Sequence, residues 1–183
     1  MLQQQGIELG TLLSDFKKDT DPIFAQLMKQ LSTSKSAEVR KRIIRAIKAP
    51  YSAGALAFLG KRIKDANPEV SILVFKQLLA TGTEITAFSS KEARMLVITE
   101  GITSPHKEVR LACIEFLKPT ILSKPEDLSY IFKLIDTRLA FTNQYFARSP
   151  SLLILAILEI LPNEIELAHF LGGIIEKLRR IAA

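Results

Sequence analysis

A short phrase that opens a helical pattern occurs three times in this chain, and it restricts the folds that the chain can adopt. The copies are Ala37-Glu38-Val39-Arg40, Pro68-Glu69-Val70-Ser71 and Lys107-Glu108-Val109-Arg110. Their valines are 31 and 39 residues apart. A repeat of that length, with a pair of helices in each copy, is typical of α-solenoids of the HEAT or armadillo kind. Because one such repeat cannot bury its apolar face alone, we expect neighbouring copies to stack.

Capping residues and prolines predict where the helices begin and end. A capping side chain precedes a proline at Asp21-Pro22, Asn67-Pro68 and Ser104-Pro105, and a proline is well tolerated at the first helical position. Capping-box spacing occurs at Ser89 with Glu92 and at Ser123 with Glu126. We place the helix-breaking residues in loops, at Ala49-Pro50, Thr81-Gly82, Gly101, Lys118-Pro119 and Ser149-Pro150.

The resulting prediction is an all-α fold of about ten antiparallel helices, forming one HEAT/armadillo-like solenoid over residues 1–183. We expect helices near residues 5–16, 21–33, 36–48, 52–64, 68–80, 90–100, 106–118, 124–138, 150–161 and 163–181. No segment alternates apolar and polar residues convincingly enough to predict a strand. The link from Ala140 to Ser149, with Phe141, Tyr145 and Phe146, is interpreted either as a loop that docks a partner or as a loop anchored by its own aromatic side chains.

Composition restricts the class of protein. A single cysteine, Cys113, cannot form an intramolecular disulfide framework. The longest apolar run, Leu152 to Leu158, is far shorter than the roughly 20 residues that a membrane-spanning helix requires. The first residues show no secretory signal. We therefore expect a soluble intracellular protein that does not bind a membrane.

Positive charge is concentrated in one part of the chain. Residues 35–64 contain nine Lys or Arg and one carboxylate, Glu38, a charge of +8, whereas the remainder carries −2 of the net +6. On a helical wheel, Val39, Ile43, Ala46 and Ile47 share the apolar side, and Lys41, Arg45 and Lys48 share the opposite side. Arg42 and Ile44 fall at the margins, and Arg40 lies nearer the apolar side. The wheel places no carboxylate where it would neutralise the three cations.

A stripe of cations at this spacing can follow a phosphate backbone, because each neutralised phosphate releases counterions. Lys61, Arg62 and Lys64 would extend the stripe, although cations also stabilise the C-terminal end of a helix. A solvated helix face remains the alternative interpretation. Because the stripe lacks aromatic residues for base stacking, it favours backbone contact over sequence reading.

The run from Ser36 to about Leu117 resembles subunit 3 of condensin, the chromosome-associated polypeptide G family of HEAT-repeat proteins. The resemblance lies in the order of several phrases: Ala37-Glu38-Val39-Arg40, Gly60-Lys61-Arg62-Ile63-Lys64-Asp65, Phe75-Lys76-Gln77-Leu78-Leu79, Phe88-Ser89-Ser90-Lys91-Glu92 and Glu108-Val109-Arg110. The chain departs from the family at Ser71, at Ser104-Pro105 and in having no tryptophan. Family members are many times longer, so the resemblance fits a fragment or a short relative.

The resemblance implies a non-catalytic subunit of a chromosome-condensing complex, located in the nucleus and on chromosomes with a possible cytoplasmic pool. Its expected partners are a kleisin subunit, the coiled-coil ATPase subunits and duplex DNA. The candidate DNA-backbone contacts are Arg40, Lys41, Arg42, Arg45, Lys48, Lys61, Arg62, Lys64, Arg94 and Arg110. The last two side chains could instead brace the packing of the repeats. A HEAT-repeat adaptor for transport or the cytoskeleton, without DNA binding, is the competing hypothesis.

We expect no enzymatic activity, no cofactor, no metal site and no small-molecule substrate. The two candidate catalytic or metal-binding side chains on one helix, His106 and Cys113, are about 10 Å apart along its axis, too far for a shared metal or a nucleophile–base pair. We expect His106 at the surface, and Cys113 and His169 in packed positions. A HEAT-like alkylpurine DNA glycosylase would need an acidic residue and aromatics facing DNA, and the aromatics here occupy core-like positions.

Overall fold

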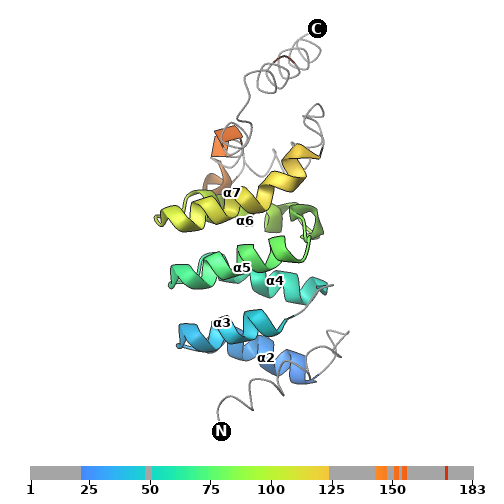
Figure 1. The fold of residues 1–183 in the computed structure, drawn as a ribbon, viewed down its shortest axis with the longest axis vertical. Helices are drawn as coiled ribbons and strands as arrows, with labels where there is room; N and C mark the ends of the chain where they lie inside the picture. Colours follow the sequence, from blue (N-terminus) through green and yellow to red (C-terminus); the bar gives the residue numbers. More distant parts are fainter. Residues whose placement is uncertain are drawn as a thin grey trace. The chain divides into compact units, whose positions relative to one another are not determined.

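In the computed structural model, the residues described are 22–47, 51–123, 143–147, 151, 152, 154, 155 and 172. The chain divides into two compact units, Met1–Thr83 and Glu84–Ala183. Within the described residues every regular element is helical, which confirms the all-α prediction for that part of the chain. The elements are α2 (Pro22–Thr33), α3 (Ala37–Ala46), α4 (Ala53–Arg62), α5 (Pro68–Ala80), η1 (Ile85–Ala87), α6 (Lys91–Ile102), α7 (Lys107–Leu122) and η2 (Gln144–Phe146) (Figure 1). The helices predicted near 5–16, 124–138, 150–161 and 163–181 lie wholly or largely outside the described residues.

The described part of the first unit contains two helix pairs, α2 with α3 and α4 with α5 (Figure 1). The pairs also contact each other, because α2 touches α4 and α3 touches α5. Apolar side chains from all four helices fill the interior, including Met28, Ile44, Leu59 and Val74, each no more than 1% exposed. This burial is the main stabilising contribution to the packing of the two pairs.

In the second unit, α6 packs against α7, η1 contacts α7 and η2 contacts α6. Met95 and Ile98 of α6 are fully buried, as are Cys113 and Leu117 of α7. Burial raises the pKa of the Cys113 thiol well above its ordinary value, because the thiolate would lose its hydration. Cys113 is therefore a packed apolar residue, as predicted. Across the described residues, no helix is long and apolar enough to cross a membrane.

The starts of α3, α4, α5 and α6 are capped by side chains, and two starts differ from the prediction. The side chains of Ser36, Ser52 and Ser90 each accept a hydrogen bond from the backbone N–H three residues later. The Asn67 side chain accepts a hydrogen bond from the Glu69 N–H at 2.9 Å. The cap of α6 is therefore Ser90, and the prediction of Ser89 was wrong. The α7 helix begins at Lys107 after an exposed His106 rather than at Pro105, because the Ser104 hydroxyl accepts the His106 N–H outside the helix.

Two predicted loop positions lie inside helices. Gly101 is buried near the end of α6, and Pro119 lies within α7, which continues to Leu122. An interior proline costs about 3 kcal/mol, but the residues that follow it, Thr120 and Ile121, are both buried. Packing of this last turn accounts for the continuation of the helix. The predicted break at Thr81-Gly82 is confirmed, since Gly82 has a φ of +65°, which glycine adopts without strain.

Candidate nucleic-acid interface

The threefold phrase extends backward into the loop before each helix. Ser34, Asp65 and Ser104 each lie two residues before the capping residue of α3, α5 and α7. Each of these side chains accepts a hydrogen bond from the backbone N–H of the capping residue. The distances are 3.3 Å from Ser36 N to Ser34 Oγ, 3.0 Å from Asn67 N to Asp65 Oδ1 and 3.3 Å from His106 N to Ser104 Oγ. The three loops therefore have the same local geometry, although the residue is a carboxylate only in the second.

An arginine at the fourth position of a helix binds its own loop at three places. Arg40 donates from Nη1 to the Ser34 carbonyl at 2.7 Å, Arg94 to the Phe88 carbonyl at 2.9 Å and Arg110 to the Ser104 carbonyl at 2.6 Å. In each case the donor lies six residues after the acceptor. Arg94 and Arg110, both candidate DNA contacts, thus each donate to the loop of their own helix.

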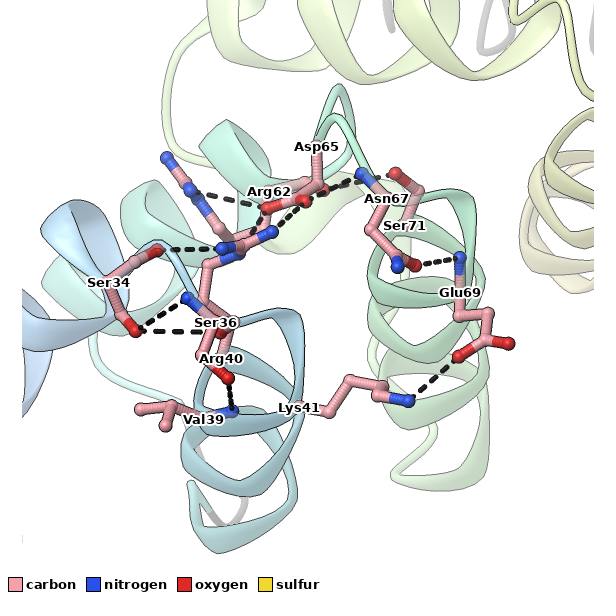
Figure 2. A network of polar contacts seen from close by, with 10 residues as sticks. All are labelled: Ser34, Ser36, Val39, Arg40, Lys41, Arg62, Asp65, Asn67, Glu69 and Ser71. Atoms are coloured by element: carbon pink, nitrogen blue, oxygen red, sulfur yellow. Dashed lines mark hydrogen bonds and ion pairs between the residues drawn. The ribbon is translucent and has the colours of Figure 1, made fainter.

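Arg40 is also paired with a carboxylate of the following helix pair. Its Nε donates to Asp65 Oδ2 at 2.8 Å and its Nη2 donates to Oδ1 at 2.6 Å, as Figure 2 shows. The side chains are 9% and 2% exposed. Arg62 approaches the same carboxylate, with its Nη1 at 3.3 Å from Oδ2. Two of the predicted DNA contacts, Arg40 and Arg62, thus face an internal carboxylate.

Lys41 lies between two carboxylates. Its Nζ is 3.0 Å from Glu38 on the same helix and 2.8 Å from Glu69 on α5, and Figure 2 shows it extending toward Glu69. Hydrogen bonds to Glu69 and then Glu38 raise the pKa of Lys41, and the hydrogen bond from Lys41 lowers the pKa of Glu38. The expectation that no carboxylate neutralises this face was wrong, because Glu38 and Glu69 both do.

The buried side of α3 also differs from the wheel. Val39 is 40% exposed, whereas Ile44 is 0% and Arg40 is 7% exposed. The buried set is therefore Arg40, Ile43, Ile44 and Ile47, which have the i, i+3, i+4, i+7 spacing of one helix face. Pairing with Asp65 allows Arg40 to occupy a position that a wheel of hydrophobicity assigns to an apolar residue.

The cations that remain open to solvent are fewer than predicted. The Arg42 and Arg45 side chains are 66% and 55% exposed, and their closest carboxylate, Glu38, is 4.0 and 3.9 Å away. Lys61 is exposed, with its Nζ 5.5 Å from the centre of the Phe58 ring. Lys64 is exposed as well, and Lys48 lies outside the described residues. Arg42, Arg45 and Lys61 are therefore the best placed to meet a phosphate.

Charge is distributed very unevenly between the two units. The described residues of the first unit include ten Lys or Arg and three Asp or Glu, a charge of +7. Those of the second include five of each, a charge of zero. The exposed Lys76 of α5, which sequence reasoning left out of the site, belongs to the positive unit. A polyanion would therefore be attracted to the first unit.

Two carboxylates that pair with cations of the site were not predicted from the sequence, because they lie beyond residues 35–64. Asp65 and Glu69 come from the loop and first turn of the next repeat. The signal that could have found Asp65 is its position, which matches Ser34 and Ser104 relative to the repeated phrase.

The aromatic link is anchored by its own residues where it is described. Phe146 is 9% exposed. Its ring packs edge-to-face with the ring of Tyr145, and the two ring centres are 4.9 Å apart. The Tyr145 hydroxyl donates to the Glu100 carboxylate of α6. These contacts correspond to the interpretation of a self-anchored loop.

Comparison with known proteins does not assign a family. No protein-family model, no curated protein and no solved structure matches the chain. Among the described residues, no cluster of His, Cys, Asp or Glu has the arrangement of a metal site.

Proposed function

We propose that the chain is a non-catalytic HEAT-repeat scaffold that contacts duplex DNA through its N-terminal unit. The proposed fold is a solenoid of about ten helices over residues 1–183, of which the two helix pairs of the first unit would be part. The repeated loop geometry around Ser34, Asp65 and Ser104 supports a repeat origin. The sequence resemblance supports a condensin-like complex, with a kleisin and coiled-coil ATPase subunits as partners and the nucleus and chromosomes as the location.

The observation that carries the DNA contact is the charge of +7 on the described part of the first unit, against zero on the second. Arg42, Arg45 and Lys61 would make the contacts, with Lys48 and Lys64 beside them in the sequence. Three neutralised phosphates give a slope of about −2.7 in a plot of log affinity against log salt. Raising the salt concentration fourfold would then weaken binding roughly fortyfold.

A protein adaptor without DNA binding is the second candidate, and the internal ion pairs favour it. Arg40, Arg62 and Lys41 are held by carboxylates of their own chain. Cations held in this way gain less from a phosphate than free ones do. An acidic protein surface would instead meet the exposed cations, Arg42, Arg45 and Lys61 among them.

Fluorescence anisotropy of a labelled duplex, recorded over a salt series, separates these candidates. We expect the double variant Arg42→Glu, Arg45→Glu to lose most of the affinity and to flatten the salt slope by about two. Its matched control is Lys91→Glu, Lys107→Glu, which changes the charge equally at exposed helix positions of the neutral unit and should bind nearly as the unmodified chain does. Equal losses in both variants, or no salt-dependent binding at all, would leave the adaptor as the better proposal.

A further inference from the structure

Ser104 begins a sequence that protein kinases of the proline-directed class recognise. The residues Ser104-Pro105-His106-Lys107 place a proline directly after the serine and a lysine at the third following position. Pro105, His106 and Lys107 are exposed, and Ser104 is partly exposed. Ser104, Pro105 and His106 lie in the loop before α7, and Lys107 is the first residue of that helix, so a kinase could reach the serine with little disturbance of the helix.

We propose that Ser104 is a phosphorylation site and that the guanidinium of Arg110 holds the phosphate. Arg110 already donates to the carbonyl of the same residue at 2.6 Å. Its guanidinium has further donors, and a phosphate accepts strong charge-assisted hydrogen bonds from such a group. This proposal goes beyond the scaffold function and does not depend on DNA binding.

The second repeat already holds an anion at the equivalent position. Asp65 occupies the place of Ser104 relative to its helix and accepts the N–H of the capping residue in the same way. Its carboxylate binds two guanidinium groups, those of Arg40 and Arg62. The two cations of Asp65 come from α3 and α4, because Ser71 stands at the position of Arg110 in the second repeat. Phosphorylated Ser104 would give the third repeat an anion at the same place, with Arg110 of its own helix as the cation.

The chemistry requires only an external kinase and a nucleoside triphosphate. The Ser104 Oγ forms a bond to the γ-phosphorus, the bond from that phosphorus to the bridging oxygen breaks, and the nucleoside diphosphate leaves. The hydroxyl proton passes to the general base of the kinase. Because Ser104 Oγ acts as an acceptor toward the His106 N–H, its proton is not needed for that bond.

Phosphorylation would change the electrostatics of the second unit. Its described residues have a net charge of zero, and a phosphoserine adds about −1.5 to −2 at neutral pH. The modified unit would be negative, opposite in sign to the described part of the first unit.

The first test treats the full chain with a purified proline-directed Ser/Thr kinase and Mg-ATP, and maps the modified residue by mass spectrometry. We expect modification at Ser104 that is lost in Ser104→Ala. Ser149-Pro150 is the internal control, because Leu152 stands where the lysine would be; Ser149→Ala should retain the modification at Ser104. A folded chain that is not modified at Ser104 would overturn the proposal.

The second test asks whether Arg110 binds the phosphate of phosphorylated Ser104. In a phosphorus-31 NMR titration we expect the second pKa of the phosphoserine to lie about one unit lower in the unaltered chain than in Arg110→Gln. Arg94→Gln is the matched control, because it removes the same kind of arginine-to-loop bond in α6 and should leave the phosphate titration unchanged. The same pKa in all three proteins would exclude Arg110 as the partner. If Arg110→Gln does not fold, the test is the thermal unfolding midpoint of the chain without substitutions, measured before and after phosphorylation. Binding of the phosphate by Arg110 should raise this midpoint, and a fall would contradict the proposal.

Discussion

Arg40 and Asp65 form a two-pronged ion pair, with N–O distances of 2.8 and 2.6 Å, between α3 and the loop before α5. The pair is almost completely shielded from water, and Arg62 and the Asn67 N–H complete the surroundings of the carboxylate. It connects two consecutive helix pairs of the first unit.

Removing one partner of this pair should be strongly destabilising. Arg40→Ala leaves Asp65 buried with only Arg62 as a cation, and breaking a buried pair in this way costs about 3–5 kcal/mol. Urea denaturation gives the change in the free energy of unfolding. Arg45→Ala, at an exposed arginine on the same helix, should change it by no more than about 0.5 kcal/mol. Similar losses in both variants would show that the Arg40–Asp65 pair has no special role.

The lowered pKa of Glu38 depends chiefly on Lys41. We expect Lys41→Met to raise that pKa toward its ordinary value of 4.5, as followed by NMR titration of the carboxyl carbon. Arg42→Met should have a smaller effect, because Arg42 contributes least to the shift. A pKa that is lower in the folded state stabilises the fold above pH 4.5, and this contribution is lost as the pH falls through the folded value. A larger effect from Arg42 would contradict the assignment.

Replacing Pro119 by alanine should stabilise α7. The side chain of Pro119 is exposed, so the change leaves the core intact while it restores a backbone N–H and relieves the ring clash inside the helix. Allowing for the greater freedom of the unfolded alanine chain, we expect a gain of about 2 kcal/mol in thermal or urea unfolding. A loss of stability would mean that the backbone conformation fixed by proline is needed for packing.

The hydroxyl of Tyr145 should ionise late in an alkaline titration. Burial, followed by the hydrogen bond to Glu100, raises its pKa. The raised value stabilises the fold below the ordinary pKa of 10.0, and this contribution is lost as the pH rises through the folded value. An absorbance titration should therefore show the ionisation of Tyr145 shifting downward in Glu100→Gln, with Tyr145→Phe identifying the signal. An unchanged titration in Glu100→Gln would contradict the contact.

The helix boundaries could be predicted where both ends are marked by side-chain chemistry. The prediction of residues 68–80 matches α5 residue for residue, because Asn67-Pro68 fixes its start and Thr81-Gly82 its end. The end of α7 could not be predicted, since the signal from Pro119 is outweighed by the burial of the next two residues. That balance is tertiary and is absent from the local sequence.

The candidate site was predictable in its composition but not in its pairing. The sequence identified the concentration of cations between residues 35 and 64. Which cations remain open depends on Asp65 and Glu69, which lie 25 and 28 residues beyond Arg40 and Lys41. Only the packing of α3 against α5 brings those groups together.

The bonds from arginine to loop imply an order of folding events. The bonds of Arg40 to Ser34, Arg94 to Phe88 and Arg110 to Ser104 each span six residues, so they can form as soon as the first helical turn does. The Arg40–Asp65 pair closes a loop of 25 residues and bears a larger entropic cost. The loop before each helix can thus adopt its conformation locally, before consecutive helix pairs pack together. Arg40 takes part in both steps, through its bond to Ser34 and its pair with Asp65.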